Sequence, residues 1–171
     1  MDTQSLFSLV GRTALVTGGS RGIGKMIASG FIGQGAKVYI SSRKADVCEA
    51  VADELGPNCI AVPQDISTVD GCKTLAATMA EHESAVDILV NNAGAAWGEP
   101  FETFPEAGWD KVMDLNVKTP FFLTQKLHTL LTAAASADKP GKVINITSID
   151  GQRVNPWETY SYQASKAALI H

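Results

Sequence analysis

The sequence is poor in cysteine, and its three cysteines do not form a recognisable site. Cys48, Cys59 and Cys72 are an odd number, with neither C-x-x-C spacing nor adjacent histidines. This pattern indicates neither a disulfide framework nor a zinc site. We therefore expect unreactive thiols, which behave mostly as small apolar side chains, and no metal ion.

Long apolar runs and clusters of basic residues are also missing. No stretch approaches the roughly 18 apolar residues of a membrane span, and the opening MDTQSLFSLVGR has no basic start leading into an apolar core. Lysine and arginine number 14 against 18 aspartate and glutamate, and no basic run offers a nucleic-acid surface. We expect a cytoplasmic chain that binds neither membrane nor nucleic acid.

What the sequence does contain is an alternation of short β-branched runs and helical patterns. Strands are expected at 12–17, 36–41, 58–63, 86–90 and 142–147, with helices at 22–35, 45–55 and 67–83 and in a long region from about Trp109. This alternation is typical of a doubly wound α/β fold with a parallel sheet. Right-handed crossovers predict the strand order 3-2-1-4-5 and a crevice above strands one and four. Length argues for one domain, residues 1–171.

The segment TGGSRGIG, residues 17–24, follows the first strand directly and opens the first helix. This is the context that a dinucleotide-binding fingerprint requires. Glycine at 18, 22 and 24 allows a tight turn and close approach to a pyrophosphate, which the free N–H groups of the helix start attract. A tight strand-to-helix connection without a ligand is the alternative.

Cofactor preference is indicated where the second strand ends, at Ser42 and Arg43. Enzymes that prefer the unphosphorylated nicotinamide cofactor commonly place an acidic residue near here, whereas an arginine can bind the 2′-phosphate. Arg21, inside the glycine turn, can add a second positive charge. These residues predict NADPH, and the alternative is that both arginines are solvated surface residues.

Further motifs follow the later strands in a fixed order: Asp65 in QDIS, NNAG at 91–94, Asn116 in LNV, Ser148 in TSIDG, and Tyr162 with Lys166 in YQASK. Together with TGGSRGIG, they resemble the short-chain dehydrogenase/reductase (SDR) family, from about Leu9 to the last residue. The resemblance implies a Rossmann-type domain, NADPH/NADP+ as cofactor, and a small-molecule carbonyl or alcohol as substrate.

The resemblance also implies the site residues. The catalytic tetrad is Asn116, Ser148, Tyr162 and Lys166. The cofactor-binding residues are Gly18, Ser20, Arg21, Gly22, Ile23, Gly24, Ser42, Arg43, Asp65, Ile66, Asn92, Ala93, Gly94, Tyr162 and Lys166.

The chemistry of this tetrad centres on a phenol beside an ammonium. Tyr162 and Lys166 stand four residues apart, so they share one helix face. The positive charges of Lys166 and of an oxidised nicotinamide favour the phenolate, so Tyr162 is the expected proton donor to the forming alkoxide. Tyr160 has Ala164 at the corresponding position and lacks this partner. The hydroxyl of Ser148 either stabilises the carbonyl oxygen or caps a local turn.

Pro120 affects the backbone carbonyl of Asn116, which lies four residues before it. Proline lacks an N–H and crowds the carbonyl four residues back, so the carbonyl of Asn116 loses its helical partner. In the family this carbonyl holds a water molecule that relays protons to the lysine. A helix kink required by packing is the alternative explanation of the proline.

A looser resemblance concerns the substrate. NNAGAAWG, GWDKVMDLNV and KVINITS together resemble the β-ketoacyl reductases of bacterial rhamnolipid synthesis, which implies a 3-oxoacyl substrate. Trp97, Phe101 and Trp109 are then candidates for the walls of an acyl pocket. The alternative is that these aromatic residues belong to the core.

The position of the last residue, His171, leads to a further expectation. Members of this family normally continue for further strands and a substrate-covering segment, so we expect a chain that is incomplete at its C-terminus, with an unpaired edge at the fifth strand. A homo-oligomer is expected for a full-length chain. The competing hypothesis is a truncated, non-catalytic NADP-binding module or subunit.

Overall fold

The computed structural model describes residues 6–171 and contains a five-stranded parallel sheet. The strands are β1 (Thr13–Thr17), β2 (Lys37–Ser41), β3 (Cys59–Ala61), β4 (Ile88–Asn91) and β5 (Lys142–Asn145). Their order is β3-β2-β1-β4-β5, and every neighbouring pair is parallel. The predicted fold class and strand order are confirmed.

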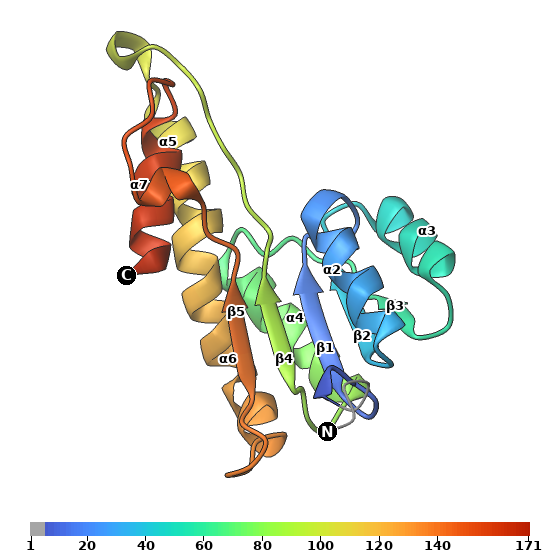
Figure 1. Ribbon diagram of the computed structural model, residues 1–171. Coiled ribbons are helices and arrows are strands. Elements are labelled where there is room, and N and C mark those ends of the chain that lie inside the picture. Colours follow the sequence, from blue (N-terminus) through green and yellow to red (C-terminus); the bar gives the residue numbers. More distant parts are fainter. Residues whose placement is uncertain (1–5) are drawn as a thin grey trace.

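Helices cover the sheet on both faces (Figure 1). Helices α2 (Gly22–Gly33) and α3 (Ala45–Leu55) pack on one face, and α4 (Val69–His82) and α6 (Thr119–Ala133) pack on the other. Side chains of β1 alternate between the two cores: Ala14 and Val16 face α2 and α3, whereas Leu15 faces α4 and α6. Strands that are buried on both faces explain why the sequence shows continuous apolar runs here.

Two further helices, α5 (Glu106–Met113) and α7 (Tyr160–Ile170), lie side by side near the carboxyl end of β5 (Figure 1). The loop from β4 to α5 includes the single turn η1 (Phe101–Thr103), and the loop from β5 to α7 includes the turn η3 (Ile149–Gly151). Helix α5 begins earlier than the predicted Trp109, directly after Pro105. As the N-cap residue, Pro105 accepts hydrogen bonds from the N–H groups of Gly108 and Trp109 through its carbonyl, which requires no N–H of its own.

The long helical region is interrupted by a wide turn, η2 (Asp114–Lys118), before α6 begins. The N–H of Thr119 donates to the carbonyl of Asp114, five residues back, which is the pairing of a π-helix. Pro120 then lies in the first turn of α6. Because η2 runs on into α6, Pro120, which has no N–H, leaves the carbonyl of Asn116 without the partner of a regular helix, and the wide turn before it accommodates this loss. The irregularity predicted around Pro120 is therefore a wide turn that precedes the proline.

Strand β5 differs from the inner strands because all four of its residues are exposed. Val143 is 44% exposed and Ile144 is 40% exposed, whereas Val38 in β2 is completely buried. The expected open edge is thus present, since β5 pairs only with β4 in the described residues.

The cysteines are buried and unpaired, as the sequence indicates. Burial raises the pKa of the Cys59 thiol to about 11, so the reactive thiolate is scarce at neutral pH. Within residues 6–171, no helix is long and apolar enough to cross a membrane. No group of three or more metal-ligating side chains comes together in that same part of the chain.

Candidate active site

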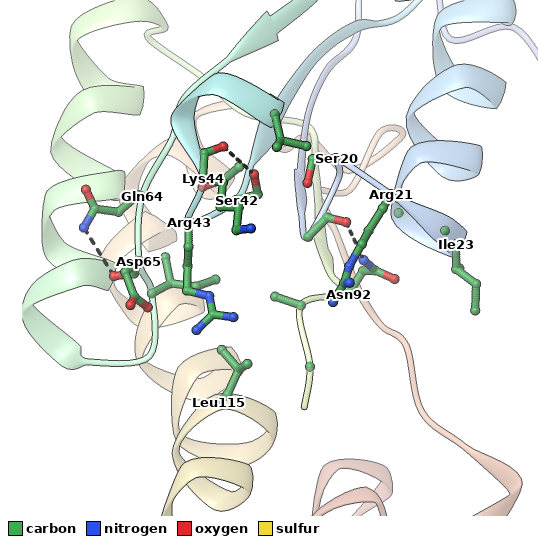
Figure 2. Close-up of a pocket in the computed structure, with 18 residues that line it drawn as sticks. Ser20, Arg21, Ile23, Ser42, Arg43, Lys44, Gln64, Asp65, Asn92 and Leu115 are labelled. Atoms are coloured by element: carbon green, nitrogen blue, oxygen red, sulfur yellow. Dashed lines mark hydrogen bonds between the residues drawn. The ribbon is translucent and has the colours of Figure 1, made fainter. Parts of the chain in front are cut away.

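A pocket of about 560 Å³ opens at the carboxyl ends of four strands, where the sequence placed the crevice (Figure 2). Its walls come from residues 18–24 after β1, 41–47 at the end of β2, 64–66 after β3 and 92–94 after β4, and Leu115 of η2 closes one side. Every predicted cofactor-binding residue except Tyr162 and Lys166 lines this pocket.

The turn between β1 and α2 has backbone angles and close contacts that require glycine. Gly18 and Gly22 have φ angles of +64° and +52°, in the left-handed region that favours glycine. A Cβ on Gly24 would lie 2.3 Å from the carbonyl oxygen of Gly18 and 2.4 Å from Nδ2 of Asn92. Helix α2 therefore starts in direct contact with the loop after β4. Arg21 provides no side-chain cap, so the first N–H groups of α2 are left available to an anion.

Thr17 connects the carboxyl ends of β1 and β4 by hydrogen bonds. It was not among the site residues predicted from the sequence. Its Oγ1 accepts hydrogen bonds from the backbone N–H groups of Asn92 and Ala93, both at 3.0 Å, and donates to the carbonyl of Val90 at 3.1 Å. Asn92 in turn donates to the carbonyl of Thr17 at 2.8 Å. The available signal was a polar residue ending the apolar run TALVT, because buried hydroxyls need partners.

Arg43 and Lys44 place positive charge at the β2 side of the pocket, and Arg21 lies in the glycine turn after β1. Arg21, Arg43 and Lys44 all line the pocket, and Figure 2 shows the long side chain of Arg43 reaching into the space. Lys44 is a third cation that the sequence analysis did not name. Ser41 also lines the pocket, but its hydroxyl is buried, without a hydrogen-bond partner among the described residues. The pocket therefore offers cations to an anionic ligand.

Tyr162 and Lys166 share one face of α7, as predicted from their spacing. Nζ of Lys166 lies 5.7 Å from the centroid of the Tyr162 ring and donates to the carbonyl of Ile146 at 2.7 Å. Lys166 is only 6% exposed, and burial lowers the pKa of its ammonium group below the ordinary value. The carbonyl of Ile146 thus holds the lysine at the end of β5.

The turn that carries Ser148 is pressed against the same helix. A Cβ on Gly151 would lie 2.6 Å from the carbonyl carbon of Lys166, so only glycine permits this contact. Oγ of Ser148 accepts a hydrogen bond from the N–H of Asp150 at 3.2 Å and caps η3. The turn-capping alternative is therefore realised, but it uses only an acceptor site of the hydroxyl. The proton of Ser148 stays free for donation to a ligand.

Asn116 is buried and makes its described contacts through the side chain. Oδ1 accepts from the N–H of Ala95 at 2.8 Å, while Nδ2 donates to the carbonyl of Ala95 and to Oγ of Ser165, both at 2.9 Å. Ser165 then donates to the carbonyl of Tyr162 at 2.7 Å. Asn116 therefore connects the loop after β4 with the turn of α7 that carries Tyr162, a contact that the sequence did not predict.

The three aromatic candidates do not line the pocket. The indole of Trp97 packs on Gly108, where a Cβ would lie 2.8 Å away, and Nζ of Lys111 lies 5.1 Å from its ring centroid. Phe101 is 74% exposed and Trp109 is 42% exposed, so the core alternative is wrong for these two residues.

Comparison with known proteins assigns the family. The model of the family described as short chain dehydrogenase matches residues 12–171. A rhamnolipids biosynthesis 3-oxoacyl-(acyl-carrier-protein) reductase from Pseudomonas aeruginosa is 48% identical over 165 residues, which are 95% of this chain and 64% of that protein. Nodulation protein G from Rhizobium sp. is 39% identical over 166 residues, 96% of this chain and 65% of that protein. The chain thus spans slightly less than two thirds of these relatives.

Solved structures agree with this assignment. The Pseudomonas aeruginosa RhlG/NADP active-site complex matches with a TM-score of 0.93 and 48% identity, covering 95% of this chain and 64% of that one. A 3-ketoacyl-(acyl-carrier-protein) reductase from Brucella melitensis, complexed with NADH, matches with a TM-score of 0.88 and 30% identity, covering 95% of this chain and 67% of that one. By sequence and by fold, the chain belongs to the short-chain dehydrogenase family of oxidoreductases.

Proposed function

We propose that this protein is an NADPH-dependent oxidoreductase that reduces a ketone, in particular a 3-oxoacyl thioester, to a secondary alcohol. The observation that carries the proposal is the placement of Tyr162 and buried Lys166 on one face of α7, with the Ser148 turn packed against that helix through Gly151. We further propose that residues 1–171 form one dinucleotide-binding domain.

The pocket fits a phosphorylated dinucleotide by the chemistry of its donors. The uncapped start of α2 suits a pyrophosphate, and the cations Arg21, Arg43 and Lys44 suit a 2′-phosphate. The relative from Pseudomonas aeruginosa binds NADP, whereas the relative from Brucella melitensis was solved with NADH. Family membership alone therefore does not decide between the two cofactors, and the basic wall supports NADPH. Once bound, this cofactor supplies the hydride.

The residues of the chain then have to orient the carbonyl and deliver one proton. Ser148 can donate its free hydroxyl proton to the carbonyl oxygen, where negative charge develops. Tyr162 gives its phenolic proton to the forming alkoxide. Lys166 uses one N–H for the carbonyl of Ile146, which leaves two donors for the cofactor's hydroxyl groups and a positive charge near the phenol.

Asn116 is proposed to act in two ways. Its carboxamide fixes α7 against the loop after β4 through Ala95 and Ser165. Its backbone carbonyl is the proposed holder of the water molecule that relays protons to Lys166, as the resemblance to the family implies. The first role positions Tyr162, and the second replenishes its proton.

A second candidate is a non-catalytic NADP-binding module, which the exposed edge of β5 favours. Mixing the purified chain with NADPH and a panel of 3-oxoacyl thioesters, while following the absorbance of the reduced nicotinamide, separates the two. Consumption of NADPH supports the reductase. Binding of NADPH without consumption supports the module, and no binding at all contradicts both.

Replacing the proposed proton donor tests the mechanism. We expect Tyr162→Phe to lower turnover by about 10² to 10⁴-fold, the usual contribution of a positioned acid, while the affinity for NADPH stays within about threefold. Tyr160→Phe is the matched control, because Tyr160 has no lysine four residues later and should keep its turnover. Unchanged turnover of Tyr162→Phe would remove this role from Tyr162.

A further inference from the structure

Thr119 is a buried polar residue to which the proposed function gives no role. It is the first residue of α6, shortly after Asn116 in the chain, and only 4% exposed. Its Oγ1 donates a hydrogen bond to the backbone carbonyl of Ile66 at 2.6 Å. Ile66 lines the dinucleotide pocket, whereas Thr119 is not among the residues that line it. This hydroxyl therefore joins the helical region that carries Asn116 to one wall of the pocket.

The carbonyl of Ile66 has two side-chain donors of unequal strength. The second is the thiol of Cys72, whose Sγ lies 3.6 Å from the same oxygen. A thiol is a weak donor, whereas a hydroxyl at 2.6 Å lies at the short end of the usual range for O–H···O hydrogen bonds. Ile66 and Thr119 are both buried, which strengthens a hydrogen bond between them relative to one in water. Thr119 is therefore the stronger of the two constraints on this carbonyl.

The loop around Ile66 is joined closely to the start of α4. A Cβ on Gly71 would lie 1.9 Å from the carbonyl oxygen of Asp65, so the first turn of α4 is in direct contact with the loop. Oδ1 of Asp65 accepts from the N–H of Ser67 at 3.0 Å. Oγ1 of Thr68 caps α4 by accepting from the N–H of Gly71 at 3.1 Å. A ligand that contacts Asp65 or Ile66 therefore meets a segment that moves as one unit with α4.

Through its backbone, Thr119 is joined to the wide turn η2. Its N–H donates to the carbonyl of Asp114, the first residue of that turn. Leu115 of the same turn lines the pocket and packs against the core cluster that contains Ile66. Asn116 comes next and is not among the residues that line the pocket, because its carboxamide bonds the loop after β4 and α7. Thr119 thus connects the pocket wall at Ile66 with the turn that presents Asn116.

We propose that Thr119 is a positioning residue through which NADPH, bound beside Ile66, fixes the turn η2 and with it Asn116. This inference rests on the proposed function, because it concerns both the proposed cofactor and the proposed role of Asn116. Energetic coupling between two sites is reciprocal. A change at Asn116 must therefore alter the affinity for NADPH, and that effect must pass through Thr119. A hydroxyl that only satisfies a buried carbonyl would contribute to stability without such coupling.

Removing the hydroxyl tests this link. Thr119→Val keeps the shape of the side chain but removes the donor to Ile66, so we expect the dissociation constant for NADPH, measured by isothermal titration, to rise about 3- to 10-fold. Turnover at saturating NADPH and substrate should also fall about 3- to 10-fold, because Asn116 is displaced even when the pocket is filled.

Two further variants serve as controls for this change. Thr119→Ser retains the hydroxyl and should keep both the NADPH affinity and the turnover within about twofold of the unchanged protein. Thr132→Val removes a hydroxyl of the same helix that donates to the carbonyl of His128 at 2.9 Å, and it should change neither quantity.

A double-mutant cycle shows whether the effect of Asn116 on NADPH passes through Thr119. Asn116→Ala should weaken NADPH binding about 3- to 10-fold, although Asn116 is not among the residues that line the pocket. The double variant Thr119→Val, Asn116→Ala should bind NADPH no more than about twofold more weakly than the weaker of the two single variants. Losses that multiply would mean that Asn116 acts by another route, such as Ala95 in the loop after β4, and would overturn the inference.

The outcomes distinguish this inference from the proposed function, because titration with NADPH requires no turnover. Losses that do not multiply, in a protein that consumes no NADPH, would support the link through Thr119 while contradicting the reductase. Consumption of NADPH together with losses that multiply would support the reductase and overturn the link. The absence of NADPH binding by the unchanged protein would contradict both.

The single variants can also overturn the link. It fails if Thr119→Val lowers only the stability toward urea, or if Thr132→Val weakens NADPH binding as much as Thr119→Val does. Weaker NADPH binding with unchanged turnover at saturation would likewise overturn it, since Asn116 would then not depend on Thr119. If Thr119→Val does not fold, the cycle is measured with Thr119→Ala, which removes the same donor without placing a methyl group against the carbonyl of Ile66.

Discussion

The proposed cofactor side and the proposed substrate side of the candidate site are built differently. On the cofactor side, the ends of four strands form a pocket whose backbone groups are tied together, as Thr17 and Asn92 illustrate. On the proposed substrate side, β5 is exposed along its length, and Val154 and Trp157 in the loop that follows it are 92% and 67% exposed. The cofactor side therefore derives its shape from contacts within the chain. The substrate side retains apolar surface that only a ligand or further protein can bury.

Crowding the cofactor side should have the largest effect. Gly24→Ala places a methyl group 2.3 Å from the carbonyl oxygen of Gly18, which is backbone and cannot move aside alone. We expect a loss of about 3 kcal/mol in the free energy of unfolding, measured by urea denaturation, and a fall in NADPH affinity of more than about 100-fold.

Gly30→Ala, in the same helix, is the control for this change. A Cβ on Gly30 meets no atom within 4 Å, so alanine should stabilise α2 by about 0.5 to 1 kcal/mol through its higher helix propensity. NADPH affinity should not change. If both variants behaved alike, the contact between α2 and the loop after β4 would not be what shapes the pocket.

Cofactor preference is the next largest expected effect. Arg43→Asp replaces a cation of the pocket wall by an anion, which removes a charge-assisted hydrogen bond worth about 1.5 to 3 kcal/mol. NADPH affinity should therefore fall by about 10- to 100-fold, while NADH affinity should change by less than about threefold. Isothermal titration with both cofactors measures the difference. An equal loss for both would argue against contact with the 2′-phosphate. Lys44→Ala should act in the same direction with a smaller effect.

Removing the hydroxyl of Thr17 tests how the two strand ends are tied. Thr17→Val keeps the shape of the side chain but leaves the N–H groups of Asn92 and Ala93 without their acceptor. Each such loss costs on the order of 1 to 3 kcal/mol, so we expect a drop of about 2 kcal/mol in unfolding free energy and weaker NADPH binding. Thr17→Ser retains the hydroxyl and should recover most of both. If Thr17→Ser lost as much as Thr17→Val, the hydroxyl alone would not account for the connection between the two strands.

The sequence predicted which turns line the pocket, because the signals of these turns are local. Gly18, Gly22 and Gly24 are required by a turn whose conformation depends on neighbouring residues, and strand order follows from general rules of connection. The contacts of Asn116 could not be predicted in this way. Its partner Ser165 lies far along the chain, and the wide turn η2 that presents Asn116 follows from packing against α7 and α6.

The exposed positions of the aromatic residues were likewise outside the reach of the sequence. Phe101 and Trp109 occur in a stretch that can be read as core or as pocket wall, because periodicity cannot show which face of a short turn has a neighbour. By contrast, the open edge of β5 was predicted from the resemblance to a longer family.

The smallest expected effect comes from making the same substitution in two strands, β2 and β5. Val38 in β2 is completely buried, whereas Val143 in β5 is 44% exposed. Val38→Thr buries an unpaired hydroxyl in the core and should lower the unfolding free energy by about 1.5 kcal/mol. Val143→Thr places the same hydroxyl in water and should change it by less than about 0.5 kcal/mol, since both residues suit a strand. Chemical denaturation of both variants measures the contrast. A loss at Val143 as large as that at Val38 would mean that β5 is buried in solution, and the open substrate side would then be covered by another copy of the chain.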